Sequence, residues 1–370
     1  MRAWLRLIRA KGLRNANALA LLERFGSAEA VCAATASQWL GAGAERSKVL
    51  LPDDDDAAVL ADLAWLANGA DRHLITLHDA RYPEALKTIT TPPLALFLRG
   101  DAALLPQPQL AMVGARSATP QGLENARGFA AELSRRGVLI TSGLAIGVDG
   151  AAHAGALDAK APTIAVCGTG LDRVYPARHK ALAQAILDGG GALVSEFAPG
   201  TAALAQNFPS RNRIISGLSL GVLVVEASRE SGSLITARRA VEQGREVFAI
   251  PGSIHNPLAK GCHQLIREGA KLVESVDDVL LELAPKLGAW LREQAPPVSA
   301  PAIAAAPPGS GDEATGTVLR ALTDAPQSVD TLISATGLTP EQVNTALLML
   351  ELDGRAGSVA GGGFMRLQGR

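Results

Sequence analysis

Residues 109–150 read QLAMVGARSATPQGLENARGFAAELSRRGVLITSGLAIGVDG. The apolar runs at 109–113 and 138–141 are uninterrupted, which is typical of strands buried on both faces of a parallel sheet. Between them, residues 121–136 have the apolar spacing of a helix. A glycine-containing turn follows each apolar run. This stretch therefore predicts two parallel strands joined by a crossover helix.

The same unit recurs along residues 109–283, so the whole segment predicts an α/β fold with a parallel sheet. We expect further strands at 163–167, 192–195, 222–225 and 247–250, with a short edge strand at 272–273. We expect the covering helices at 121–136, 148–159, 177–187, 212–218, 234–243 and 262–268.

Length and composition limit the class of protein. At 370 residues the chain is long enough for two or three domains. The net charge of −1 means that any contact with nucleic acid requires a local basic cleft. Charged residues interrupt residues 1–14, so we expect no signal peptide and a cytoplasmic protein. The cysteines lie far apart and without metal-ligand spacing, so we expect reduced thiols and no metal site; they are Cys32, Cys167 and Cys262.

Four segments are expected. Residues 1–70 predict a small helical domain, either a SAM-like or helix-hairpin-helix-like unit that holds a DNA backbone or a simple packing domain. Residues 71–285 contain the sheet, and residues 286–312 form an Ala- and Pro-rich linker. Residues 313–370 predict a winged-helix-like domain. Because residues 323–354 contain no Lys or Arg, we expect this domain to contact protein and not a DNA major groove.

Glycine-rich loops follow the predicted strands. They begin at Gly114, Ser142, Gly168 and Ala227, and loops that leave parallel strands gather at one edge of the sheet, where ligands bind. Glycines let the backbone amides approach a ligand closely, and helix N-termini attract anions, so these loops favour a phosphate there. Neither GxGxxG nor GxxxxGK[ST] is intact, so we expect no dinucleotide or ATP cofactor.

Residues 207–213, NFPSRNR, place an aromatic ring and two arginines next to these loops. Unstacked bases can lie on Phe208 while Arg116, Arg211 and Arg213 hold phosphates, which suits single-stranded nucleic acid.

The spacing permits a second interpretation equally well. Phe208 fills the core, and the arginines pair with Glu196 and Glu226. Residue spacing does not separate these two interpretations.

Patterns typical of enzymes are weak. Ser219 lies in a GxSxG sequence, but that sequence precedes a strand, whereas a nucleophile elbow follows one. Asp149 and His153 share a helix face without a nucleophile, which indicates structural roles. The remaining enzymatic alternative is a Rossmann-like nucleotide N-glycosidase or phosphoribohydrolase, with Glu226 and Arg229 as its nearest active-site equivalent.

Ordered motifs over residues 109–283 resemble the DNA processing protein A family, also called DNA protecting protein. They are VGAR at 113, SGLAIGVDGAAH at 142, GTGLD at 168, YP at 175, SE at 195, FPSRNRII at 208, SGSLITA at 231, FAIPGS at 248 and GCH at 261. The resemblance implies an extended Rossmann-like fold without catalysis or cofactor. It also implies a cytoplasmic homodimer that binds single-stranded DNA, protects it and loads the RecA recombinase in natural transformation.

The resemblance also assigns residues. The DNA groove would contain Arg116, Gly143, Lys180, Phe208, Arg211, Asn212, Arg213, Ser231, Ser233 and Thr236. Self-association and recombinase contact would involve His263, Leu265, Ile266 and Leu272. Many relatives place a lysine after Tyr-Pro, where this chain has Ala177; Arg178 or Lys180 would supply that charge.

Overall fold

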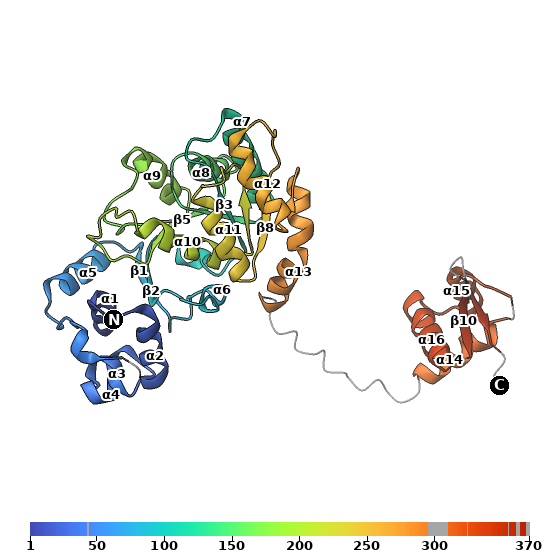
Figure 1. Cartoon of the computed structure of the whole chain (residues 1–370). Coiled ribbons are helices and arrows are strands. Elements are labelled where there is room, and N and C mark those ends of the chain that lie inside the picture. Colours follow the sequence, from blue (N-terminus) through green and yellow to red (C-terminus); the bar gives the residue numbers. More distant parts are fainter. Residues whose placement is uncertain (43, 295–309, 324, 354, 360–362, 368–370) are drawn as a thin grey trace. The chain divides into compact units, whose positions relative to one another are not determined.

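The computed structural model describes the chain except residues 43, 295–309, 324, 354, 360–362 and 368–370. It forms two compact units, Met1–Glu293 and Gln294–Arg370 (Figure 1). The second unit has a hydrophobic core of its own, formed around Val318, Leu332 and Leu350.

A nine-stranded sheet organises the first unit, in the order β1-β2-β6-β5-β4-β3-β7-β8-β9. Strand β2 pairs antiparallel with β1 and with β6, and every other pairing in this sheet is parallel. The strands are β1 (Arg72–Thr76), β2 (Ala95–Gly100), β3 (Gln109–Val113), β4 (Leu139–Ser142), β5 (Thr163–Val166), β6 (Ala192–Ser195), β7 (Gly221–Val224), β8 (Glu246–Ala249) and β9 (Lys271–Leu272).

Strand β3 is the point at which the strand order reverses. From β3 the chain crosses to β4, then β5 and β6 on one side, and returns to β7 on the other side of β3. At the carboxyl ends of these two strands, the loop after β3 leads toward β4 and the loop after β7 leads toward β8, on the opposite side, so the two loops diverge. In open α/β sheets this divergence opens the ligand crevice.

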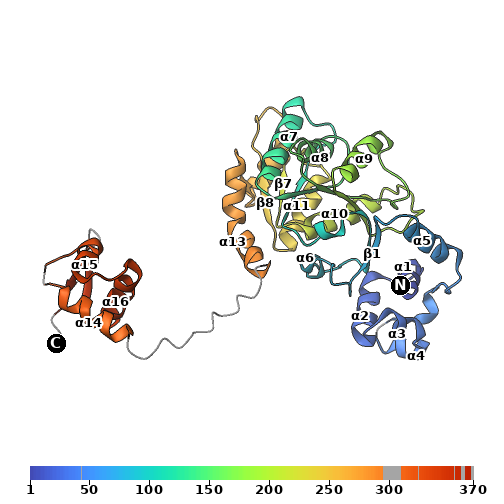
Figure 2. The ribbon, with the colours of Figure 1, turned by 180° about the vertical axis from the view of Figure 1, so that it is seen from behind.

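Helices cover both faces of the sheet (Figures 1 and 2). Leu110 and Met112 of β3 pack in one core cluster, while Ala111 and Val113 pack in another, because successive side chains point to opposite faces. One face packs against α7 (Pro120–Arg135), α8 (Val148–Asp158) and α13 (Val276–Gln294), and the other against α10 (Asn207–Leu218), α11 (Ser233–Glu242) and α12 (Lys260–Arg267). Helix α9 (Lys180–Asp188) lies beside α8 and follows the short 3-10 helix η3 (Ala177–His179).

The predicted α/β class is confirmed, and each strand expected from residue 109 onward is present within about one residue of its expected bounds. Two differences are informative. Helix α10 starts at Asn207, five residues before the expected 212. Strands β1 and β2 were not predicted, because a proline-containing segment with the short helix α6 (Glu84–Lys87) joins them in place of a crossover helix.

The N-terminal helices pack on the sheet. Trp65 contacts Phe97 of β2 edge to face, with ring centroids 6.0 Å apart, and Arg9 donates to the carbonyl oxygen of Pro199 at 2.8 Å. Ser27 caps the third helix, accepting from the amide of Ala30. These helices are α1 (Arg2–Arg9), α2 (Asn15–Phe25), α3 (Ala28–Ala33), α4 (Ala36–Leu40) and α5 (Ala57–Ala67).

The second unit has the predicted winged-helix order. It consists of α14 (Ser310–Ala321), α15 (Val329–Thr336), α16 (Pro340–Leu352), β10 (Ala356–Val359) and β11 (Gly363–Arg366). Helix α13 continues to Gln294 and α14 begins at Ser310, so both ends of the expected linker at 286–312 are helical. Its Ala- and Pro-rich centre lies outside the described residues. None of the described helices is long and apolar enough to cross a membrane.

Candidate functional site

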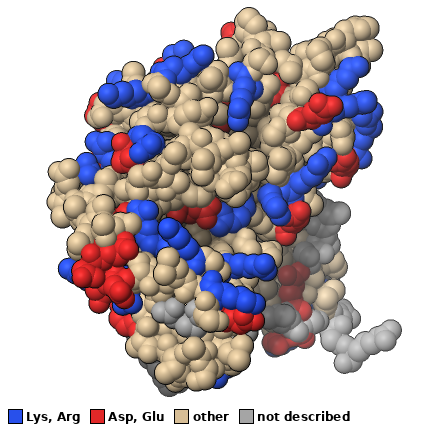
Figure 3. All heavy atoms as spheres, turned by 60° about the vertical axis from the view of Figure 1, so that its left-hand side comes forward, with Lys and Arg blue, Asp and Glu red and all other residues tan. Residues whose placement is uncertain are grey.

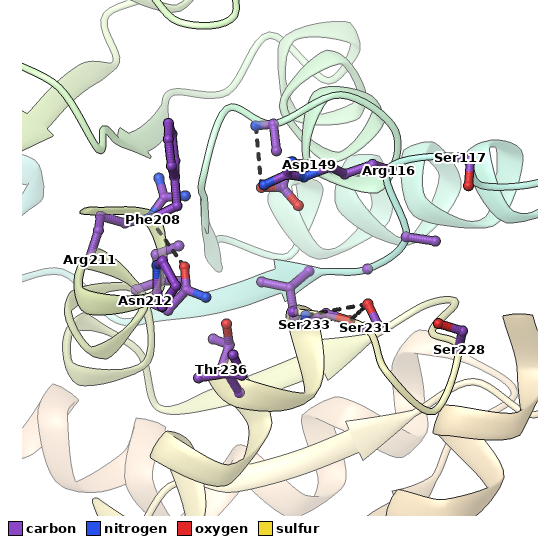
Figure 4. A pocket seen from close by; sticks show the side chains of 18 of the residues that line it. Arg116, Ser117, Asp149, Phe208, Arg211, Asn212, Ser228, Ser231, Ser233 and Thr236 are labelled. Carbon is purple, nitrogen blue, oxygen red and sulfur yellow. Dashed lines mark hydrogen bonds between the residues drawn. The ribbon is translucent and has the colours of Figure 1, made fainter. Parts of the chain in front are cut away.

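A pocket of about 560 Å³ opens where the strand order reverses (Figure 4). Residues from the loops after β3 to β8 line it, together with residues of α8, α10 and the start of α11. The predicted gathering of glycine-rich loops at one edge therefore produces a real cavity.

Helix α10 presents one face to this pocket. Phe208, Arg211, Asn212 and Ile215 line it at spacings i, i+3, i+4 and i+7, which share a side of a helix. Arg213 is on a different side and does not line the pocket. Helical phase thus separates the two arginines of the NFPSRNR segment.

Arg211 is buried, with 4% of its surface exposed. Its guanidinium donates to the carbonyl oxygen of Gly143 at 2.9 Å and to that of Val166. A Cβ on Gly143 would lie 2.7 Å from Nη2 of Arg211, so the bare backbone admits the side chain. Arg211 therefore joins the ends of β4 and β5 from inside, contrary to the expectation that it is free to hold phosphate.

Arg213 is engaged in an ion pair. Its guanidinium donates to both carboxylate oxygens of Glu196, at 2.6 and 2.7 Å, and to the carbonyl oxygen of Thr91. The second interpretation of the sequence, in which arginines pair with glutamates, is correct for this residue.

Arg116 differs from both. It extends from the loop after β3, is exposed, and has no hydrogen bond or ion pair from its guanidinium to any residue that the structure describes. Figure 4 shows it beside Asp149 at the pocket. Its charge lowers the pKa of Asp149, but a guanidinium that is exposed and makes no internal hydrogen bond or ion pair is suited to an external anion.

Two aromatic rings form the adjoining wall. The centroids of Tyr175 and Phe208 lie 5.3 Å apart with the rings tilted by 43°, and Tyr175 is 51% exposed. Phe208 rests on the backbone of Gly168, where a Cβ would lie 2.9 Å from the ring. The glycine admits the ring, which remains partly exposed to the pocket. Tyr175 was not among the predicted site residues, although YP at 175 was among the family-like motifs.

The opposite wall is formed by hydroxyl groups and helix ends. Ser231 and Ser233 share a hydrogen bond of 2.7 Å, and Thr236 lines the pocket one turn further along α11. Neither α10 nor α11 has a side-chain cap at its N-terminus. Uncapped helix starts carry partial positive charge, so this wall also favours an anion.

Asp149 is the acidic residue of the pocket lining and is itself buried. Its carboxylate accepts from the amides of Gly143 at 3.1 Å and Ala145 at 3.3 Å. Burial raises the pKa of Asp149, while the positive charge of Arg211 lowers it. We infer that Asp149 orders the loop after β4, a structural role of the kind the sequence indicated.

The predicted DNA-contact residues divide into two groups. Those that line the pocket are Arg116, Phe208, Arg211, Asn212, Ser231, Ser233 and Thr236. Those outside the lining are Gly143, Lys180 and Arg213. Lys180 is exposed at the first turn of α9. On the face drawn in Figure 3, Lys and Arg are scattered with Asp and Glu among them.

The residues predicted for self-association lie on α12 and β9, away from this pocket. Leu265 is only 5% exposed and packs in the core, and it also lines a hollow of about 470 Å³. Leu272 is 49% exposed and Ile266 is partly buried. His263 is half-buried, and its Nε2 lies 2.9 Å from the carbonyl oxygen of Gly252.

Comparison with known proteins agrees with this arrangement. Residues 73–284 match the family model of DNA recombination-mediator protein A, and residues 300–362 match that of the DprA winged helix domain. Protein Smf of Escherichia coli is 45% identical over 84% of this chain and 81% of its own length. DNA processing protein DprA of Streptococcus pneumoniae is 49% identical over 55% of this chain and 72% of its own length.

Solved structures show the same likeness. The X-ray structure of DNA processing protein A from Streptococcus pneumoniae has a TM-score of 0.66 at 38% identity, covering 76% of this chain and 98% of that one. The protein of the same name from Helicobacter pylori has a TM-score of 0.52 at 29% identity, covering 58% and 97%. The first family model alone covers more than half of the chain, so this chain is a member of the DNA recombination-mediator protein A family.

Proposed function

We propose that this chain is a non-catalytic protein that binds single-stranded DNA in the pocket at the carboxyl edge of its sheet. The observation that carries the proposal is the free guanidinium of Arg116 facing a pocket that also holds the rings of Phe208 and Tyr175. Unpaired bases stack on aromatic rings, and a guanidinium binds the phosphate between them.

The groups that line the pocket and one relative support the proposal. Uncapped helix starts and serine hydroxyls line the pocket and supply further donors for phosphate oxygens. The Helicobacter pylori relative is described in terms of its single-stranded DNA binding mode. A duplex offers no unstacked base to Phe208, so binding should favour single strands.

Fluorescence anisotropy with a labelled oligothymidylate tests the proposal. The chain should bind the single strand more tightly than a duplex of equal length, and Arg116→Ala should weaken that binding. Arg135→Ala, at the exposed far end of α7, removes the same charge outside the pocket and is the matched control. Equal affinity for duplex, or equal loss in both variants, would refute the proposal.

The N-glycosidase alternative depends on Glu226, and the structure disfavours it. The Glu226 carboxylate accepts from the amide and the hydroxyl of Thr119 at 2.8 and 2.7 Å, and it does not line the pocket. Glu226 therefore holds the start of α7. Release of free base from nucleoside monophosphates, abolished by Glu226→Gln, would restore the enzymatic hypothesis.

We further propose that the chain self-associates and passes its bound strand to the RecA recombinase in the cytoplasm, protecting incoming DNA during natural transformation. Two observations support this: Leu272 of β9 is exposed, and a hollow of about 470 Å³ is lined by residues of α11, β8 and α12, among them the exposed Val241. Leu272→Glu should lower the molecular mass measured by analytical ultracentrifugation while leaving the affinity for single-stranded DNA unchanged.

A regulator that binds duplex DNA through its winged helix is the third candidate. The longest helix of that domain, α16, carries Glu341 and Glu351 and no basic residue. Truncation before residue 295 should retain all affinity for DNA; loss of affinity would support this candidate.

A further inference from the structure

A second hollow, of about 610 Å³, lies among α7, α8 and α9. We refer to it as the α7–α9 groove. Its volume is in the range of sites that hold small ligands. Arg116 lines both this groove and the pocket described above, so the two hollows meet at the same side chain.

The walls of the groove are mainly apolar. Leu123 of α7 and Leu182 of α9 line it, and Ile146 contributes from the loop before α8. Small residues, among them Ala151 and Ala154, also line it. Such a surface can pack against the flat face of a nucleobase.

His179 adds an ordered ring to this wall. Its Nδ1 lies 2.9 Å from the carbonyl oxygen of Leu144. A carbonyl only accepts, so Nδ1 is the donor. A Cβ on Gly150 would lie 2.9 Å from Cε1 of His179, so the ring packs on bare backbone. The imidazole is held in place from two sides and presents a planar group to a base.

The charged residues that line the groove are Arg116, Glu124 and Arg127, and the exposed Glu124 carboxylate repels an anion, so only Arg116 favours one. Arg127 is already engaged, since its Nη2 donates to Asp158 at 2.8 Å. The guanidinium of Arg116, which also lines the groove, makes no hydrogen bond or ion pair with any described residue. A phosphate bound by Arg116 would therefore have the aromatic pocket on one side and the α7–α9 groove on the other.

From this juxtaposition we propose that the α7–α9 groove is a second nucleotide subsite, which takes the nucleotides that follow those in the aromatic pocket on the same strand. The proposal rests on the proposed function. Arg116 would bind the phosphate that lies between the two subsites. Affinity should consequently rise in two steps as an oligonucleotide lengthens.

The test is a length series of oligothymidylates, from about four to about twelve nucleotides, measured by anisotropy. Leu123→Glu and Leu182→Glu place a negative charge on facing walls of the groove. Ala185→Glu adds the same charge at an exposed position of α9 outside the groove and is the matched control. Leu123 is 37% exposed, so its substitution should leave the melting temperature unchanged even if Leu182→Glu lowers it.

We expect both groove variants to bind the shortest oligonucleotides as the parent does and to bind the longest about fivefold or more weakly, the loss of about one stacked base. The control should match the parent at every length. Parent-like binding of long oligonucleotides by Leu123→Glu, or an equal loss at all lengths, would overturn the second subsite while leaving the proposed function intact. Failure of the parent chain to bind any oligonucleotide would instead refute the proposed function.

Discussion

Arg211 and Arg116 line the same pocket, yet their substitution should have opposite consequences. Arg211→Met removes the donors to the carbonyl oxygens of Gly143 and Val166 and leaves Asp149 buried without its compensating positive charge. Removing one partner of a buried charge pair lowers the free energy of unfolding by about 3 to 5 kcal/mol. With an unfolding entropy of about 2.1 cal/mol/K per residue, the unit Met1–Glu293 shifts by about 1.6 °C per kcal/mol, so the melting temperature should fall by about 5 to 8 °C.

Arg116→Met should leave the melting temperature within about 1 °C of the parent, because surface substitutions rarely exceed about 0.5 kcal/mol. It should instead lower the salt dependence of single-strand binding. The slope of log affinity against log salt should decrease by about 0.7 for each phosphate that the variant no longer neutralises. Thermal melts and anisotropy at several salt concentrations, on both variants, separate the two roles.

The double variant Arg211→Met, Asp149→Asn is the internal control. Removing the carboxylate relieves the uncompensated charge, so this variant should recover part of the stability that Arg211→Met loses. The reasoning is refuted if Arg211→Met melts with the parent and changes the salt slope as Arg116→Met does. Arg211 would then contact phosphate directly.

Three further measurements follow from the geometry. Phe208→Ala should weaken single-strand binding by about 1 to 3 kcal/mol and Phe208→Trp should preserve it, whereas equal binding by both variants would exclude stacking. Burial lowers the pKa of His153 to about 3 from 6.5. Between these values the unfolded chain binds the additional proton, so stability falls as the pH drops, by up to about 1.4 kcal/mol per pH unit. His153→Leu should flatten the dependence of melting temperature on pH in that window, and an unchanged slope would contradict this assignment. Burial raises the pKa of Cys167 to about 11 and that of Cys262 to about 12; mass spectrometry after iodoacetamide treatment at pH 8 should find both unmodified while the half-buried Cys32 reacts. Rapid native labelling of either buried thiol would show that the fold opens there.

The parallel sheet was predictable because its signals are local. Uninterrupted apolar runs, glycine turns and helical spacing from residue 109 onward each depend on neighbours in the chain, and they located β3 to β9 closely. The gathering of their loops at one edge follows from the geometry of parallel strands alone. Strands β1 and β2 escaped prediction because they pair antiparallel across a proline-containing segment that resembles neither βα repeat nor short hairpin.

The roles of the three arginines were decided by tertiary structure. In the sequence Arg116, Arg211 and Arg213 are equivalent cations beside glycine loops. Folding pairs Arg213 with Glu196, 17 residues away, and joins Arg211 to the carbonyl of Gly143, 68 residues away.

The glycines show the same distinction between local and distant information. The sequence alone determined that residues without a Cβ occur in the loops at the sheet edge. It did not determine what approaches them: the Arg211 side chain fills the space at Gly143, and the Phe208 ring that at Gly168. Partners of this kind come from separate segments and meet only when the core is packed. The sequence therefore predicted the edge at which the pocket forms, while packing left Arg116, of these three arginines, without an internal hydrogen bond or ion pair.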